Sequence, residues 1–252
     1  MRWFDWIFLL FTTLITKALR LWQREIGFEA ETGLAVFDCL PAQLLPLALL
    51  VAAIYFFSRA HFIPLDKVDT RPIGESFPFG NAFICCLVVI GAFTLFTATV
   101  LFIIADFRAV NLMFSLTAAL SALIALFTVF ALRRGNSIGI VSLIPIAAHV
   151  LLLIFSYREH ASNPVLQMYY PEILALGVLL IAQLLFTAFV FGCGKPQSYA
   201  PTAALSIVLA VCAAEQTTAS ICFYSGFACI QAAFLMTSNF YRIPEETEDL
   251  HS

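Results

Sequence analysis

Charged residues are scarce in this chain of 252 residues. They make up 12% of the sequence, against about 25% in ordinary soluble domains. The net charge is −3, so the basic excess of nucleic-acid-binding proteins is missing, and we expect no nucleic-acid partner. A soluble protein with so few charges would leave large apolar patches exposed to water. The composition therefore excludes an ordinary soluble domain.

Motifs of several enzyme and metal-site classes are also missing. The sequence contains no HExxH, P-loop or GxGxxG pattern, and its seven cysteines include no CxxC pair. The histidines other than His149 lie in predicted loops or in the C-terminal tail, without a metal-ligand pattern around them. We therefore predict a protein that is not an enzyme and that needs no cofactor and no metal.

Long apolar runs dominate what is present. The residue types AVILMFWYC supply 62% of the chain, and a membrane-spanning helix needs about 20 predominantly apolar residues in a row. Eight stretches reach or approach this length, and the polar gaps between them are short. We predict an all-α, polytopic transmembrane helical bundle of about eight spans with short loops. The predicted spans are 3–22, 41–58, 80–105, 111–132, 137–157, 172–192, 202–216 and 219–240.

The first apolar run has two interpretations. It follows Arg2 and could be a signal peptide that is cleaved, but no small-residue cleavage site comes after it. Asp5, Lys17 and Arg20 interrupt the run, and the two basic side chains near its far end can reach the membrane surface. We favour an uncleaved first span.

The last apolar run, 202–240, is also open to two interpretations. Its 39 residues would form a helix of about 58 Å at 1.5 Å per residue, nearly enough for two spans. The polar cluster from Glu215 to Thr218 indicates a turn, so we predict a helical hairpin, with one long broken helix as the alternative. Residues 1–243 then form a single integral membrane domain, and 244–252 a flexible acidic tail.

The distribution of Lys and Arg predicts the orientation. With eight spans, the side of the N-terminus collects eight of these residues and the opposite side five. Because cytoplasmic loops carry the excess of Lys and Arg, we expect both termini in the cytoplasm. The expected location is the cytoplasmic membrane of a bacterium, with the lipid bilayer as the main partner.

Two strings and one turn carry a resemblance. LRLWQREIGFEAETGL follows the first span, NPVLQMYYPEILALGVLLIAQLLFTAFVFGCGKP surrounds the sixth, and a polar turn separates the last two spans. Together they resemble an uncharacterised family of bacterial eight-span integral membrane proteins. The resemblance covers the layout of the whole chain and implies eight spans. That family has no established activity, so the resemblance implies no function.

A few polar residues at membrane depth are the best candidates for a functional site. An ionisable group there is costly and is a functional hypothesis by default. His149 lies near the middle of its predicted span, and Pro145, four residues earlier, would leave the carbonyl of Val141 without its helical donor. Gln183 falls at a similar depth in the neighbouring span, and Gln231 of the eighth span lies within about 4 Å of the midplane on its other side. These residues form either a solute site or inter-helix hydrogen bonds that hold the bundle together.

Two non-enzymatic functions are compatible with this pattern. The leading hypothesis is a membrane scaffold, sensor or assembly subunit, because buried charge is nearly absent. The alternative is a small-solute transporter or channel that uses a polar site near His149 and Gln183. The scaffold hypothesis allows a membrane protein partner or a homo-oligomer. The transporter hypothesis predicts a water-accessible cavity that reaches His149.

Overall fold

The protein is an all-helical bundle. The structure, a computed structural model, describes residues 3–29, 36, 39–62, 73–136, 138–161, 165–214 and 217–238. The regular elements of these residues are helices, which confirms the predicted fold class. They are α1 (Trp3–Ile26), α2 (Leu40–Ala60), α3 (Ile73–Ser76), α4 (Ala82–Ala105), α5 (Ala109–Arg133), the 3₁₀ helix η1 (Gly139–Leu143), α6 (Ile144–His160), α7 (Leu166–Val190), α8 (Pro196–Ala213) and α9 (Thr218–Thr237).

Seven helical segments are long and apolar enough to cross a membrane. They are α2, α4, α5, η1 with α6, α7, α8 and α9. Large apolar side chains cover their outer faces, for example Phe93 and Ile104 on α4, which are 72% and 74% exposed. Such a surface suits the hydrocarbon of a bilayer and not water. The protein is therefore a multi-pass membrane protein. The helix α1 is not among the seven, so the eighth span stays a prediction.

The last apolar run forms two helices, as predicted. The helices α8 and α9 pack against each other as a hairpin. Glu215 and Gln216 of the predicted turn lie outside the described residues, as does the predicted tail 244–252. The hydroxyl oxygen of Thr217 accepts a hydrogen bond from the Ser220 N–H at 3.1 Å, so Thr217 caps the start of α9.

The predicted starts of two spans were too late. The helices α7 and α8 begin at Leu166 and Pro196, each six residues before the predicted starts at 172 and 202. The prediction placed Pro171 and Pro201 outside the helices, but both lie within them. Proline is favourable in the first turn of a helix, as at Pro196, and neighbouring helices make it tolerable inside membrane helices.

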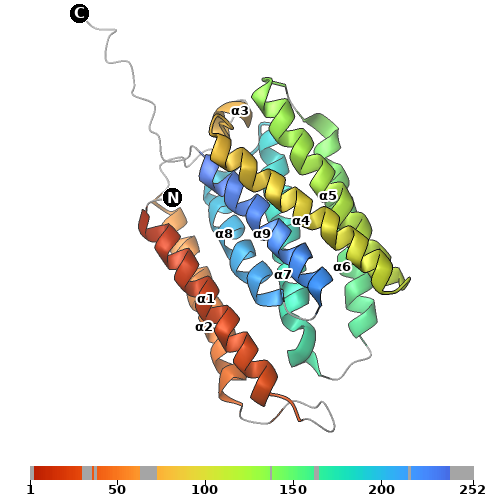
Figure 1. The fold of residues 1–252 in the computed structure, drawn as a ribbon. Helices are drawn as coiled ribbons and strands as arrows, with labels where there is room; N and C mark the ends of the chain where they lie inside the picture. The colour runs from red at the N-terminus through yellow and green to blue at the C-terminus, as the bar shows by residue number, and fades with distance from the viewer. Residues whose placement is uncertain are drawn as a thin grey trace, which may run out of the picture.

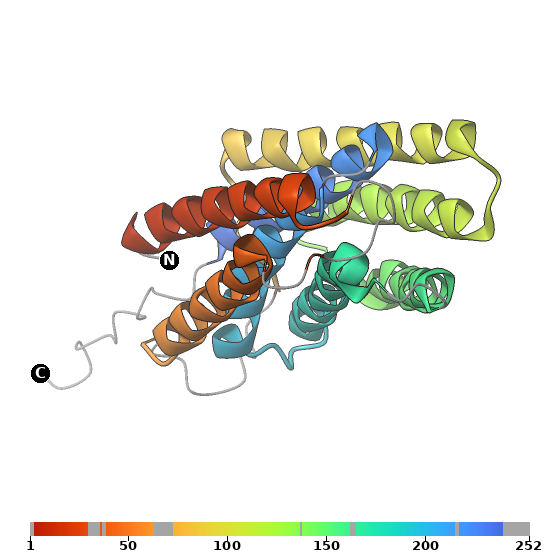
Figure 2. The same cartoon turned by 90° about the horizontal axis from the view of Figure 1, so that it is seen from below.

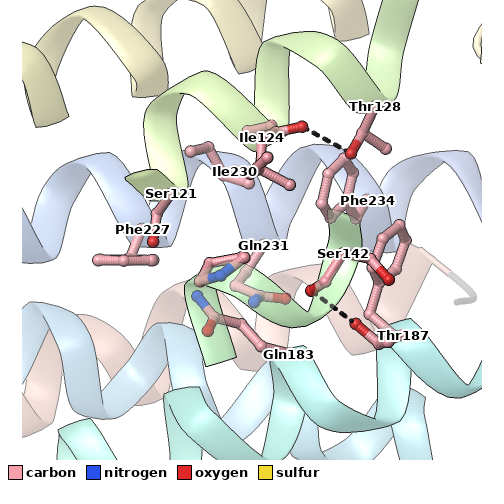
Figure 3. A pocket seen from close by; sticks show the side chains of 13 residues that line it. Ser121, Ile124, Thr128, Ser142, Gln183, Thr187, Phe227, Ile230, Gln231 and Phe234 are labelled. Carbon is pink, nitrogen blue, oxygen red and sulfur yellow. Dashed lines mark hydrogen bonds between the residues drawn. The ribbon is translucent and has the colours of Figure 1, made fainter. Parts of the chain in front are cut away.

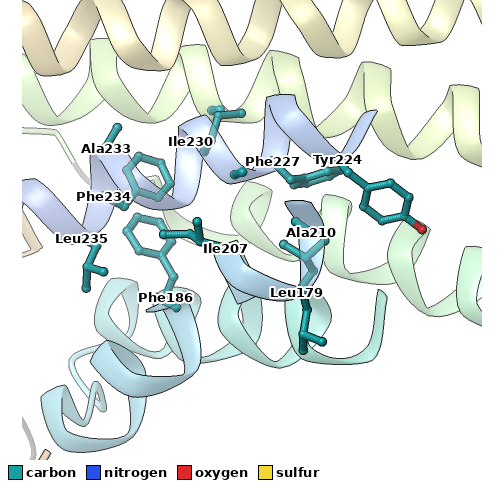
Figure 4. Packing of buried hydrophobic residues seen from close by; sticks show 14 of the residues in the cluster. Leu179, Phe186, Ile207, Ala210, Tyr224, Phe227, Ile230, Ala233, Phe234 and Leu235 are labelled. Carbon is teal, nitrogen blue, oxygen red and sulfur yellow. The ribbon is translucent and has the colours of Figure 1, made fainter. Parts of the chain in front are cut away.

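The helix α9 is the centre of the bundle. It packs against α4 on one side and α8 on the other, as Figures 1 and 2 show, and α5, α6 and α7 complete the larger part of the bundle. The pair α1–α2 forms an antiparallel hairpin at one side, which joins the rest mainly through α8. Large apolar side chains of α7, α8 and α9 interdigitate in the core (Figure 4).

Candidate functional site: a polar cavity among four helices

The start of α6 is formed by a break in the fifth predicted span. The span begins as the 3₁₀ helix η1 and continues as α6 from Ile144, so Pro145 occupies the first turn of α6. The carbonyl of Val141 accepts the Ile144 N–H. The prediction that Pro145 leaves this carbonyl free was therefore wrong, because the change to 3₁₀ geometry provides another donor. Pro145 instead contributes its ring to a cavity wall.

The three polar candidates lie at comparable depths. His149 is 11 residues before the end of α6 at His160, and Gln231 is 13 residues after the start of α9 at Thr218. Gln183 is 14 residues after Tyr169, where the membrane-spanning part of α7 begins. All three distances are counted from the same end of the bundle and correspond to about 16–21 Å at 1.5 Å per residue. The residues therefore lie at a common level along the bundle, well inside both of its ends.

Gln183, Gln231 and Pro145 line one cavity of about 50 Å³ between α5, η1–α6, α7 and α9. Gln183 and Gln231 point into it from α7 and α9 (Figure 3). We call this space the inner cavity. Its other polar lining residues are Ser121, Thr128, Ser142 and Thr187, and its other apolar ones are Ile124, Ala125, Phe186, Phe227, Ile230 and Phe234.

The inner cavity has unpartnered polar atoms on three sides. Among the described residues, Ser121 Oγ, Gln183 Oε1 and Gln231 Oε1 are buried and have no hydrogen-bond partner. A buried polar group without a partner costs about 1–3 kcal/mol. The volume is enough for a few water molecules and far below the 300 Å³ or more of typical drug-sized ligand sites. The cavity can therefore hold water or a solute of a few atoms.

His149 lies one layer behind the cavity wall. Its side chain is fully buried and interacts with Gln183, while its ring centroid is 5.2 Å from that of Phe227. Within the described part of the chain, neither ring nitrogen has a hydrogen bond of normal geometry. Gln183 lies between the imidazole and the inner cavity, which Gln231 also lines. His149 is not among the described residues that line this cavity, so the predicted cavity that reaches His149 is not found.

The hydroxyl groups of the lining were not predicted from the sequence. Thr128 donates to the Ile124 carbonyl at 2.7 Å, and Thr187 donates to the Ser142 carbonyl at 3.4 Å (Figure 3). The first bond stays within α5, and the second joins α7 to η1. Ser and Thr are common in membrane helices, where they bond to the backbone of their own helix. Their type alone therefore gives no signal of a cavity.

Two stacked aromatic rings form part of the cavity wall. Phe186 of α7 and Phe234 of α9 stack at 4.5 Å between centroids, nearly parallel, and both rings appear in the packed core of Figure 4. The backbones of α7 and α9 do not pack closely against each other. The inner cavity lies in the space that this separation leaves.

Metal-ligand clusters and a serine motif are two further candidates for a reactive site. Among the described residues, no three His, Cys, Asp or Glu side chains gather as metal ligands. A G-x-S-x-G pattern does occur at 135–139, but a nucleophile elbow needs a strand before the serine and a helix after it. Here the pattern links α5 to η1, and Ser137 itself lies outside the described residues.

Comparison with known proteins assigns neither a family nor a function to this chain. No family model, no curated protein and no solved structure matches this chain. The resemblance to bacterial eight-span membrane proteins thus keeps only its coarser part, a multi-pass membrane protein made of helices.

Proposed function

We propose that this protein binds a small neutral polar solute in the inner cavity and passes it across the membrane as a channel or transporter, without chemical conversion. The unpartnered oxygens of Ser121 and Gln231 face one small space, together with Gln183, which also contacts His149, and this arrangement supports the proposal. A guest that offers hydrogen bonds would satisfy these groups.

The chemistry of the lining supports a neutral solute. None of the described residues that line the inner cavity carries a charge. An ion that moved into it would lose its hydration without meeting an opposite charge, which costs several kcal/mol. Amide and hydroxyl groups can both donate and accept hydrogen bonds. Molecules of the size of water or ammonia fit both the chemistry and the volume.

We also propose that α1 is the eighth span. Its 24 residues extend about 36 Å at 1.5 Å per residue, enough to cross a bilayer. Phe4, Leu10 and Leu14 point outward and are 74%, 64% and 69% exposed, whereas Thr16 and Gln23 point inward and are fully buried. An apolar exterior over a polar interior is the arrangement expected of a helix in lipid.

A scaffold, sensor or assembly subunit is the second candidate. It is favoured by inter-helix hydrogen bonds that other hydroxyls make, such as Thr117 of α5 to the Ala148 carbonyl of α6 at 3.2 Å. Thr99 and Ser115 likewise donate to each other's carbonyls between α4 and α5, at 3.3 Å. In this case the partner would be a membrane protein or a second copy of this chain.

Solute flux into liposomes tests the leading proposal. Purified protein is reconstituted, and the permeability to water and to ammonia is measured by light scattering and by an internal pH dye. We expect wild-type protein to raise at least one of these rates above that of protein-free liposomes, and the double variant Gln183→Leu/Gln231→Leu to remove the increase. The matched control is Gln43→Leu, since Gln43 is exposed on α2, which supplies no lining residue.

A further inference from the structure

A second cavity, of about 520 Å³, opens at the end of the bundle where α4 joins α5 and α6 approaches α7. We call it the charged cavity. Its charged lining residues are Asp106, Arg108, Glu159, His160 and Glu172. Arg108 pairs with Asp106 at 2.6 Å and with Glu159 at 3.9 Å, and Glu172 accepts a hydrogen bond from Ser156 at 3.0 Å. Three carboxylates against one guanidinium and one imidazole leave the carboxylates in excess, which makes this cavity attractive to cations and open to neutral polar solutes.

A layer of phenylalanine side chains separates the two cavities. Phe102 and Phe114 line the charged cavity, and Phe227 lines the inner cavity. Phe223 lies between them and is fully buried. Its ring centroid is 6.2 Å from that of Phe102, 5.0 Å from that of Phe114 and 4.9 Å from that of Phe227.

The aromatic layer adjoins the polar site directly. The His149 ring is 6.4 Å from Phe223 and 5.2 Å from Phe227, centroid to centroid. Phe223 is thus the residue that contacts both the lining of the charged cavity and the imidazole behind the inner cavity. Displacement of its ring from these neighbours would open the aromatic layer between the two spaces.

We propose that Phe223 is the gate between the charged cavity and the inner cavity, and that the solute enters or leaves through the charged cavity. This inference rests on the proposed function. The gate also accounts for selectivity: cations gather among the carboxylates, but the layer of Phe102, Phe114 and Phe223 offers them no polar ligand. Hydrophobic constrictions of this kind exclude ions by dewetting. The solute that passes is small and uncharged.

The experiment measures permeability to water, ammonia and potassium in liposomes that contain wild-type protein, Phe223→Ala or Phe223→Leu. We expect Phe223→Ala to raise the water or ammonia rate several-fold, with a smaller rise for Phe223→Leu. The matched control is Phe56→Ala. Phe56 is buried in an aromatic cluster with Phe8 and Tyr55, between α1 and α2, and it lines neither cavity. Size-exclusion chromatography and thermal unfolding show which variants are folded.

Two further comparisons test whether the solute passes through the inner cavity. Adding Gln183→Leu/Gln231→Leu to Phe223→Ala should remove the extra flux, because the opened route passes through the inner cavity. Flux that persists in this triple variant would overturn the gate, and so would a rise in Phe56→Ala equal to that in Phe223→Ala. Folded Phe223→Ala and Phe223→Leu that both match the wild type would do the same.

The outcomes also separate the gate from the proposed function. If wild-type flux depends on Gln183 and Gln231 but no Phe223 variant changes it, the gate is wrong and the proposed function stands. If every variant, Phe223→Ala included, conducts no faster than protein-free liposomes, the proposed function fails, and the gate fails with it.

Discussion

Single residues decide how closely the central helices pack. Gly91 of α4 and Gly226 of α9 face each other where these helices cross. A methyl group at Gly226 would lie 2.7 Å from Leu95 Cγ and 2.9 Å from the Gly91 carbonyl oxygen, and one at Gly91 would lie 2.9 Å from the Gly226 carbonyl oxygen. Small residues at such crossings let membrane helices approach closely, where packing replaces the hydrophobic driving force.

The variant Gly226→Ala should therefore destabilise the protein. The added methyl group must push apart two backbones, and overpacking of this kind costs about 1–3 kcal/mol. Thermal unfolding in detergent would measure it as a lower midpoint. The control is Gly177→Ala on α7, where nothing lies within 4 Å of the added atom, and where alanine favours the helix by up to about 1 kcal/mol. Equal midpoints for the two variants would contradict the close crossing.

At the scale of single residues, the polar candidates could be predicted from the sequence because polar residues are rare within its long apolar runs. His149, Gln183 and Gln231 interrupt long apolar runs, and counting residues was enough to place them at one depth. The aromatic layer could not be predicted from the sequence. The chain has 26 phenylalanines, so Phe223 is not distinctive until the fold brings it next to Phe114 and Phe227. Pro145 was identified as a wall of the site, but its effect on Val141 was wrong because the 3₁₀ helix could not be foreseen.

Among the helices, α1 has a polar buried face and an apolar exposed face. Its buried face carries Thr12, Thr16 and Gln23, whereas Phe11 and Leu14 face outward. The polar face packs on α2 and α8, and Lys17 donates to the carbonyl of Ala214, just past the end of α8, at 2.5 Å. A cation there complements the negative end of the α8 dipole. This contact ties α1 to the bundle, as expected of a retained helix.

The ion pair between α1 and α2 should contribute to stability. Asp5 is buried and lies 2.9 Å from Arg59 Nε, and Tyr55 donates to the same carboxylate at 3.1 Å. We expect Asp5→Asn to lower the free energy of unfolding by about 2 kcal/mol, less than the roughly 3–5 kcal/mol of a fully buried pair, because Arg59 is partly exposed.

The same substitution at Asp106 serves as the control for Asp5→Asn. The Asp106–Arg108 pair is short but its side chains are 50% and 69% exposed, and such pairs contribute about 0–1 kcal/mol. Chemical unfolding in mixed micelles would compare the two variants. A loss at Asp106 as large as that at Asp5 would mean that burial does not determine the strength of these pairs.

The bounds of two helices were predicted less well than the division of the last apolar run. The hairpin of α8 and α9 was correct because a polar cluster interrupts an apolar run that is too long for one span. The predicted starts of α7 and α8 were too late because the prediction ended each preceding loop at a proline. In the structure, the helices continue through Pro171 and Pro201. Proline marks a helix end reliably only where no neighbouring helix can compensate for the lost hydrogen bond.

For the whole molecule, the number of spans determines where the termini lie. The first residues of α1 and the last residues of α9 are at the same end of the bundle (Figure 1). If α1 spans the membrane, the chain crosses eight times and both termini face the same side. If α1 lies on the surface, the seven remaining spans place the start of α2 and the end of α9 on opposite sides.

We predict that both termini face the cytoplasm, because the side of the N-terminus carries eight of the 13 Lys and Arg residues. Epitope tags at the two ends, probed by protease in right-side-out vesicles and again in inverted ones, would measure this. Both tags should be protected in the first preparation and cleaved in the second. One protected and one cleaved tag in the same preparation would rule out the eighth span. The reverse pattern for both would keep eight spans but invert the orientation, so that the charged cavity would face the cytoplasm and the solute would meet the carboxylates of Asp106, Glu159 and Glu172 from inside the cell.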